Sequence, residues 1–236
     1  RRLAAVGDRV YVTLGIDAPV SVLDAANGET LHTFEGSEHT REIIVSDGTA
    51  FLVAEDHTSK LLSWRRKATY VWDNTRRANT GWGWQGEKRG LLAYKTDSRT
   101  QLWKAEYPVA PCSLCADSKM VAFCDGTKLV ALERESGRKK WETATVPMPS
   151  QVPSNTGPRV LIYGNMVLLA GNNGKFAGFS ADDGTRKWEA VQKPTGHLSL
   201  RDLYIAGGLV WTAAIALNQQ DGKFTGYDPF TGKIVK

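Results

Sequence analysis

The chain has 236 residues, of which 42% are hydrophobic and 23% charged, and its formal net charge is +5. This balance excludes a disordered chain, and no apolar run approaches the roughly 20 residues of a membrane-spanning helix. The 23 glycines and 8 tryptophans favour an all-β protein with tight turns and aromatic packing.

The positive charge is concentrated in one stretch. Residues 54–89 hold eight Lys and Arg against four Asp and Glu, so this stretch alone carries +4 of the net charge. The remainder of the chain is nearly neutral. The basic pI therefore gives little reason to expect nucleic-acid binding.

Two kinds of predicted hairpin alternate along the chain. The first kind has a short turn between apolar runs, such as Asp47-Gly48, Gly164-Asn165 or Gly207-Gly208, which predicts a tight β-hairpin. In chain order this kind occupies residues 6–12, 45–53, 116–123, 163–169 and 206–212.

The second kind is a repeat of the form A-x-D-x-x-x-G-x-x-x-W, which begins at Val20, Gly90, Lys128, Lys175 and Lys223. Its turn glycine, where we expect a positive φ, is Gly28, Gly137, Gly184 and Gly232. Its tryptophan is Trp103, Trp141 and Trp188. Its acidic position, which we interpret as a brace of the turn, holds Asp24, Glu133 and Asp228.

Three positions depart from the repeat. Arg99 replaces the turn glycine of the second unit and predicts a strained or altered turn. His32 and Lys236 replace the tryptophan in the first and last units, and we interpret His32 as a packing substitute.

One hairpin of each kind makes a four-stranded meander. Successive turn positions from Arg99 onward are 38 to 48 residues apart, which is typical of propeller blades. The 71 residues between Gly28 and Arg99 indicate an insertion, at residues 54–89, within the second unit. We therefore predict an all-β fold, with residues 1–236 forming a single β-propeller arc of about five four-stranded units.

This pattern resembles the tryptophan-docking repeat of the quinoprotein alcohol dehydrogenase-like, or PQQ-like, β-propellers. The style of the repeats is similar to that of large planctomycete-type PQQ-like repeat proteins and, more distantly, of BamB-type assembly factors. The small first residue of the repeat corresponds to Val22, Ala93, Ala131, Gly178 and Gly226. The resemblance implies that each tryptophan clamps adjacent blades, that missing blades of an eight-bladed ring lie elsewhere in the parent protein, and that the location is periplasmic.

The resemblance also raises a PQQ-dependent dehydrogenase as the alternative function. Such enzymes use an adjacent Cys-Cys pair, a tryptophan floor and calcium ligands, and this chain has no adjacent cysteines. No G-x-S-x-G or H-E-x-x-H motif occurs, and the four histidines are scattered. We therefore predict no cofactor, with PQQ and calcium as the alternative, and no catalytic constellation.

The three cysteines are Cys112, Cys115 and Cys124, the first two of which form a C-x-x-C pattern. Residues three apart on a strand point to opposite faces, and no second C-x-x-C or nearby histidine completes a metal site. We interpret them as buried thiols, with a zinc or redox site as the alternative.

The insertion combines aromatic and basic side chains that can stack on a ligand or anchor a peptide. Its candidate binding residues are Trp64, Arg65, Arg66, Trp72, Arg76, Arg77, Trp82 and Trp84. The simpler alternative is that these tryptophans pack on the propeller. We predict a non-catalytic scaffold for a protein partner or small ligand; an accessory domain of a larger enzyme, such as a methyltransferase-fused protein, is a further alternative.

Overall fold

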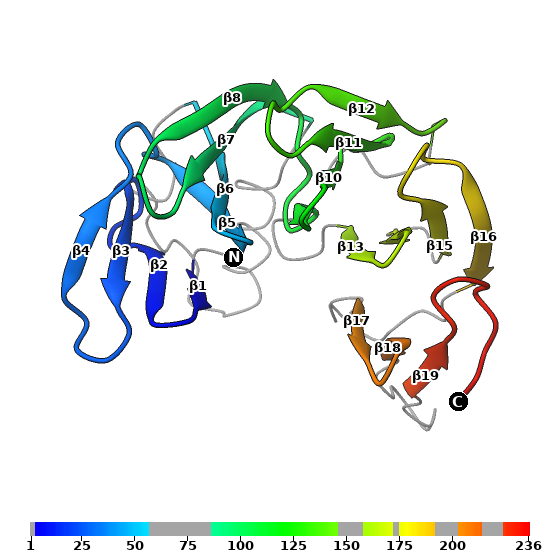
Figure 1. The fold of residues 1–236 in the computed structure, drawn as a ribbon. Helices are drawn as coiled ribbons and strands as arrows, with labels where there is room; N and C mark the ends of the chain where they lie inside the picture. The colour runs from blue at the N-terminus through cyan, green and yellow to red at the C-terminus, as the bar shows by residue number, and fades with distance from the viewer. Residues whose placement is uncertain (1–2, 57–85, 146–157, 172–174, 192–202, 214–223) are drawn as a thin grey trace, which may run out of the picture.

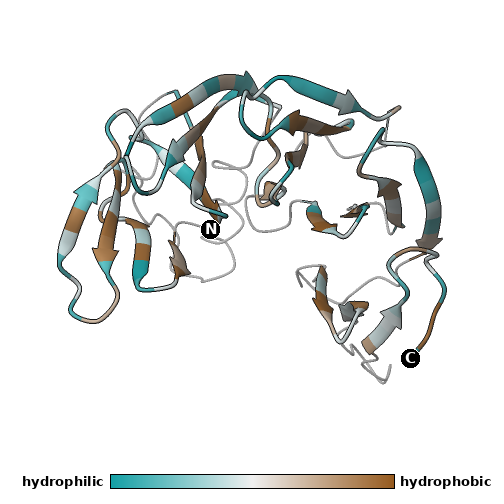
Figure 2. Ribbon diagram, viewed as in Figure 1, coloured by the Kyte–Doolittle hydropathy of each residue, from teal (hydrophilic) through white to brown (hydrophobic). Residues whose placement is uncertain are grey.

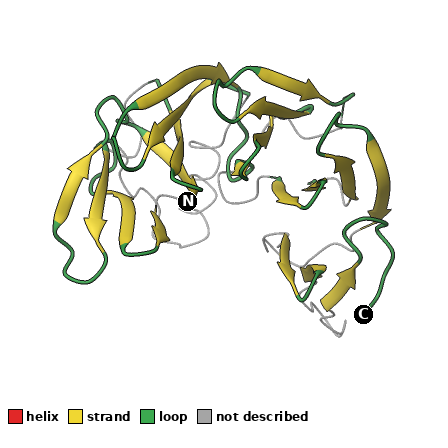
Figure 3. Ribbon diagram, in the orientation of Figure 1, coloured by secondary structure: helices red, strands yellow, loops and turns green. Residues whose placement is uncertain are grey.

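The computed structural model describes residues 3–56, 86–145, 158–171, 175–191, 203–213 and 224–236. Within these ranges the secondary structure consists of strands and turns, with no helix (Figure 3). The prediction of an all-β propeller built from four-stranded blades is confirmed. The described part of the chain contains no helix that is long and apolar enough to cross a membrane.

The strands form five antiparallel sheets in chain order, which we call blades 1 to 5. Blade 1 consists of β1 (Leu3–Val6), β2 (Arg9–Thr13), β3 (Val20–Asp24) and β4 (Thr30–Thr33). Blade 2 consists of β5 (Thr40–Ser46), β6 (Thr49–Ala54), β7 (Arg89–Lys95) and β8 (Gln101–Tyr107). Blade 3 consists of β9 (Cys115–Ala116), β10 (Met120–Cys124), β11 (Leu129–Glu133) and β12 (Lys139–Glu142).

Blade 4 consists of β13 (Arg159–Tyr163), β14 (Met166–Ala170), β15 (Lys175–Ser180) and β16 (Arg186–Val191). Blade 5 has three strands, β17 (Leu203–Ala206), β18 (Leu209–Ala213) and β19 (Phe224–Tyr227). A single bridge between Tyr227 and Ile234 marks where a fourth strand would pair. The blades are arranged in an arc, with β4, β8, β12 and β16 on its outer edge (Figure 1).

The core consists of apolar layers between neighbouring blades. In β6, Leu52 belongs to the layer shared with blade 1, whereas Phe51 and Val53 belong to the layer shared with blade 3. Both faces of a middle strand are thus buried, because side chains alternate along a strand. The outermost strands β12 and β16 are hydrophilic, whereas β10 and β11 are more hydrophobic (Figure 2).

Three of the four joints between blades contain an indole ring that lies over a glycine of the next blade. A Cβ added at Gly137 would lie 2.7 Å from two ring carbons of Trp103. The corresponding closest distances are 2.7 Å from Gly184 to Trp141 and 2.5 Å from Gly232 to Trp188. These glycines have φ values of 67°, 73° and 68°, so both the backbone conformation and the close approach require glycine.

Each of these indoles also donates a hydrogen bond to the turn that it covers. The acceptors are the carbonyl oxygens of Arg134 (2.8 Å from Trp103), Ala181 (2.9 Å from Trp141) and Pro229 (3.1 Å from Trp188). A buried indole N–H needs such a partner, so the carbonyl fixes the orientation of the ring.

The small first residue of the repeat lies directly across the sheet from the tryptophan. The pairs are Ala93 with Trp103, Ala131 with Trp141, and Gly178 with Trp188. A Cβ at Gly178 would lie 2.4 Å from Trp188, so a large side chain there would displace the ring.

The joint between blades 1 and 2 differs from the other three joints at all three positions: the indole, the small residue opposite it and the turn glycine. His32 stands in place of the indole, Val22 lies opposite it, and Arg99 stands in place of the glycine. Arg99 has a φ of 62° and its N–H still donates to the Lys95 carbonyl at 3.1 Å. The backbone of this turn is therefore strained, but its hydrogen bond is kept.

Other aromatic side chains fill the same joint. His32 is buried and meets Phe34 edge to face, and Phe34 stacks on Tyr94 of blade 2 with ring centroids 4.9 Å apart. Burial, together with the positive charges of Arg99 and Arg9, lowers the pKa of His32, which favours the neutral ring.

We predict that Gly184→Ala lowers the free energy of unfolding by about 3 kcal/mol, because it adds an overlap with Trp141 to the strain of a positive φ. The control is Gly7→Ala, since Gly7 has a φ of 61° with nothing within 4 Å of an added Cβ. The control should lose only about 1 kcal/mol. Urea denaturation measures both losses, and equal losses would contradict the joint described above.

We also predict that His32→Trp destabilises the protein, because Val22 and Arg99 occupy the space that an indole needs. When Val22→Ala and Arg99→Gly are added to His32→Trp, the free energy of unfolding should exceed the value expected from the separate effects by at least about 1 kcal/mol. Denaturation of the single, double and triple variants measures this coupling, and simple additivity would refute it.

Candidate interaction face

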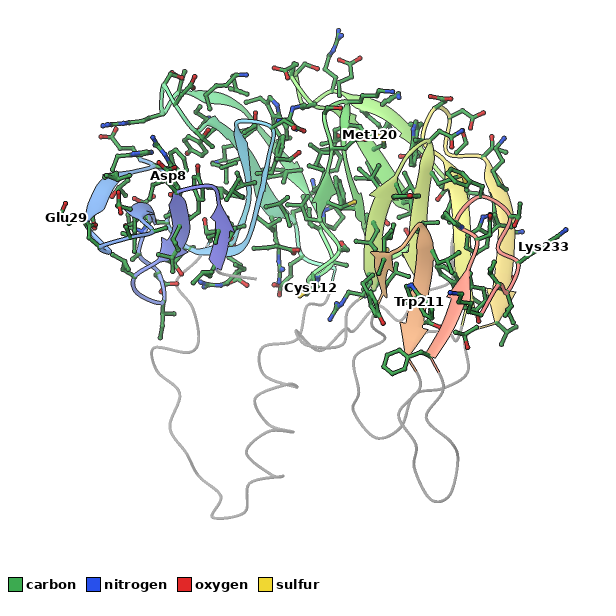
Figure 4. The ribbon with its side chains drawn as sticks, turned by 60° about the horizontal axis from the view of Figure 1, so that its bottom comes forward. Asp8, Glu29, Cys112, Met120, Trp211 and Lys233 are labelled. Carbon is green, nitrogen blue, oxygen red and sulfur yellow. The ribbon has the colours of Figure 1, made fainter. Side chains whose placement is uncertain are left out.

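The two ends of the strands differ in how they are connected. At one end, which we call the turn face, successive strands are joined by two to five residues. At the opposite end, the loop face, connections include residues 55–88, 143–158, 192–202 and 214–223. Figure 4 labels Met120 on the side of the turn face and Cys112 on the lower edge, at the loop face. Propeller loops are where binding residues are usually found.

A partly buried ionic cluster lies on the loop face at the joint between blades 1 and 2. Arg41, at the start of β5, donates from Nε to Glu55 at 2.7 Å and from Nη2 to Asp17 at 3.0 Å. Its Nη1 donates to the Ile16 carbonyl at 2.9 Å. The guanidinium therefore holds the loop between β2 and β3 of blade 1 against blade 2.

The same cluster joins the two ends of the connection between β6 and β7. Glu55 follows β6 and Arg89 begins β7, and the pair is separated by 3.5 Å. Only 8% of the Arg89 side chain is exposed, and burial lowers the pKa of Arg89, although Glu55 and Glu42 oppose this effect. We refer to Asp17, Arg41, Glu55 and Arg89 as the Arg41 cluster.

A second contact extends from this region to blade 3. Glu42 is 3% exposed and accepts a hydrogen bond of 2.9 Å from the backbone N–H of Cys112. Cys112 precedes β9 in a turn with a φ of 61° rather than on a strand. Glu42 therefore fixes the loop between blades 2 and 3, as Arg41 fixes the loop of blade 1.

The cysteines do not form a metal site among the described residues. None of the three is in a disulfide, and no group of three His, Cys, Asp or Glu in the described ranges could hold a metal ion. Cys115 and Cys124 are buried, whereas Cys112 is partly exposed. Burial raises the pKa of Cys124 to about 12, so its thiol is protonated and unreactive near neutral pH.

The donor set expected for a quinone cofactor with calcium is not assembled by these residues. Asp24 and Asp228 accept hydrogen bonds from backbone N–H groups of their own turns, and Glu133 binds Ser136 and Arg138. These carboxylates lie in different blades, on the turn face. These three carboxylates therefore do not form a site for the cofactor and its calcium ion.

The candidate binding residues of the insertion, from Trp64 to Trp84, lie outside the described residues. The repeat tryptophans and glycines are brought together in pairs, as described above, except Gly28, which has nothing within 4 Å of an added Cβ. Sequence reasoning missed Arg41 and Asp17. Neither has a sequence signal beyond its charge, because Asp17 lies in the loop between β2 and β3 and Arg41 is the second residue of β5.

Blades joined by an indole over a glycine turn define a β-propeller of the tryptophan-docking type. A family model described as "Outer membrane protein assembly factor BamB" matches residues 87–236, which is more than half of the chain. The chain belongs to this family. No curated protein sequence matches it.

Solved structures support the same fold. BamB from Moraxella catarrhalis is 14% identical, with a TM-score of 0.64 over 98% of this chain and 62% of that chain. The computationally designed Ika8 protein is 16% identical, with a TM-score of 0.61 over 98% of this chain and 59% of that one. KlHsv2 with a replaced loop is 7% identical, with a TM-score of 0.63 over 97% of this chain and 64% of that one. The chain thus spans about three fifths of their length.

We predict that Arg41→Met lowers the free energy of unfolding by about 3 kcal/mol, because it leaves the partly buried carboxylate of Asp17 without its guanidinium and leaves Glu55 with Arg89 alone. Arg138→Met is the control, because Arg138 pairs with Glu133 while 77% of its side chain is exposed. The control should change stability by less than about 0.5 kcal/mol. Chemical denaturation measures the loss of stability in both variants. Equal losses would contradict a partly buried cluster.

We predict a loss of stability with rising pH that depends on Cys124. The folded-state pKa of this thiol, about 12, lies above its ordinary value of 9.0, so its contribution to stability is complete below pH 9 and is lost as pH rises toward 12. Denaturation at several pH values should show a shallower decline for Cys124→Ala than for the wild type. Parallel declines would show that this thiol does not titrate as stated.

Proposed function

We propose that the chain is a non-catalytic β-propeller scaffold that binds a protein partner through its loop face. The observation that carries this proposal is the Arg41 cluster, which pairs the two ends of residues 55–88 with each other and links them through Arg41 to blade 1. A rigid base of this kind reduces the ordering cost of binding.

The family description supports a role in the assembly of outer-membrane proteins. For the same reason we propose that the scaffold lies in the periplasm. The basic, tryptophan-rich residues 57–85 are proposed as the main contact, because tryptophan and arginine are enriched among residues that dominate protein interfaces. This part of the proposal rests on the sequence.

The test is site-specific photo-crosslinking in the cells that produce the protein. A photoreactive residue replaces exposed Lys88 on the loop face, and the control replaces exposed Ser136 on the turn face. We expect one protein partner to be crosslinked from Lys88 and not from Ser136, and to be lost when Trp82 and Trp84 are changed to alanine. Crosslinking of the same partner from both faces, or of none, would contradict the proposal.

A parallel assay addresses the enzymatic alternative. The purified protein is titrated with pyrroloquinoline quinone and calcium, followed by dye-linked alcohol oxidation. A scaffold gives neither saturable binding nor dye reduction. Turnover would make the protein an oxidoreductase.

A further inference from the structure

His39 lies on the loop face beside the Arg41 cluster, with its backbone fixed in an unusual conformation. It has a φ of 60°, in the left-handed region that histidine adopts more often than most residues do. Its carbonyl oxygen accepts a hydrogen bond of 3.1 Å from the backbone N–H of Glu55, the residue that follows β6. The backbone at the end of β6 therefore fixes the point from which the imidazole extends.

The imidazole faces the carboxylate of Asp17, in the loop between β2 and β3. Its Nδ1 atom lies 3.2 Å from Asp17 Oδ1, and only 29% of the His39 side chain and 14% of the Asp17 side chain are exposed. Nδ1 is buried and has no hydrogen-bond partner among the described residues. A buried polar atom without a partner costs free energy, whereas a positive charge on the ring turns this close approach into an ion pair.

The charges around this contact nearly balance. Arg41 donates to the same carboxylate oxygen from Nη2 at 3.0 Å and to Glu55 from Nε at 2.7 Å. Arg89 lies 3.5 Å from Glu55 on the other side, and Glu38, which precedes His39, is exposed to solvent. The Arg41 cluster thus contains two guanidinium groups and two carboxylates. The charge of the imidazole therefore decides whether the group as a whole is neutral or carries one positive charge.

The loop at residues 14–19 depends on these side chains for its position. Arg41 Nη1 donates to the carbonyl of Ile16 at 2.9 Å, beside the contact with the carboxylate. Within the loop, the backbone hydrogen bond from Ala18 N–H to the Gly15 carbonyl is 3.4 Å long and therefore weak. The contacts made by Arg41 and His39 are thus what hold this part of the loop face against blade 2.

We propose that the contact between His39 and Asp17 is a pH-sensitive latch, which fixes the loop at residues 14–19 more tightly against blade 2 when the imidazole is protonated. Carboxylates ordinarily titrate at about pH 4, whereas histidine is the side chain whose charge changes between about pH 5 and pH 8. A proton taken up from solvent gives the ring a positive charge and an N–H donor on each nitrogen, while Arg41 stays charged throughout. The conformation of the loop face therefore depends on pH. That a bound partner senses this dependence rests on the proposed function.

The first test is a double-mutant cycle of His39→Asn and Asp17→Asn, measured by urea denaturation at pH 5.5 and at pH 8. Asparagine is chosen at position 39 because it tolerates a positive φ. We expect the coupling between the two positions, expressed as a ratio of folding equilibrium constants, to be about fivefold larger at pH 5.5 than at pH 8. Equal coupling at both pH values would overturn the proposal.

The control cycle combines His32→Asn with Asp17→Asn. His32 is a buried histidine of the same joint, but the charges that act on it are those of Arg99 and Arg9. It should show no coupling to Asp17 at either pH. A pH-dependent coupling of the same size in this control would show that the effect is not specific to the contact at His39, and would also overturn the proposal.

The second test follows the loop itself by ¹⁵N relaxation at the two pH values. The amides of residues 15–17 should have higher order parameters at pH 5.5 than at pH 8, and His39→Asn should remove this difference. The amides of residues 7–8, in a turn of the same blade on the turn face, should not change. No difference in the wild type, or a difference that persists in His39→Asn, would overturn the latch. Neither test involves a partner, so failure of the latch is distinct from failure of the crosslinking at Lys88, which concerns the scaffold alone.

Discussion

The structure depends on one interaction, the packing of an indole from one blade over a glycine turn of the next. The sheets are separate antiparallel units, and no strand pairing crosses from one blade to its neighbour among the described residues. The blades are therefore held together by apolar layers, by Trp103, Trp141 and Trp188, and by the polar contacts of Arg41 and Glu42. A buried tryptophan is worth about 3–5 kcal/mol on truncation to alanine, which is a large part of the stability of a domain.

The joint between blades 1 and 2 shows what happens where the indole is missing. The three positions that form the indole contact in the other joints are Val22, His32 and Arg99 here. Stacked rings of Phe34 and Tyr94 replace the indole, and Arg41 adds an ionic contact at the opposite face. This alternative joint is also the one from which residues 55–88 leave, so its charges both hold two blades together and anchor the proposed binding region.

The repeat made the fold predictable, because turn glycines and alternating apolar residues are local signals that recur at blade spacing. The sequence also indicated that the turn at Arg99 would be strained. It did not reveal that the altered turn faces the blade whose tryptophan is missing, because that relation joins residues 67 positions apart, from His32 to Arg99. The Arg41 cluster was missed for a similar reason: Asp17, Arg41 and Glu55 are single charges on separate loops and strands, and only the folded blades bring them together.

Hydrogen exchange of the indole N–H groups shows whether these indoles are locked between blades. Trp103, Trp141 and Trp188 donate to carbonyls of the next blade, whereas Trp211 donates to Ala206 within blade 5, in an exposed hydrogen bond. We expect slow exchange for the first three, at rates close to those of the buried sheet amides, and fast exchange for Trp211. If the three docking indoles exchange as fast as Trp211, the blades are not held together by them.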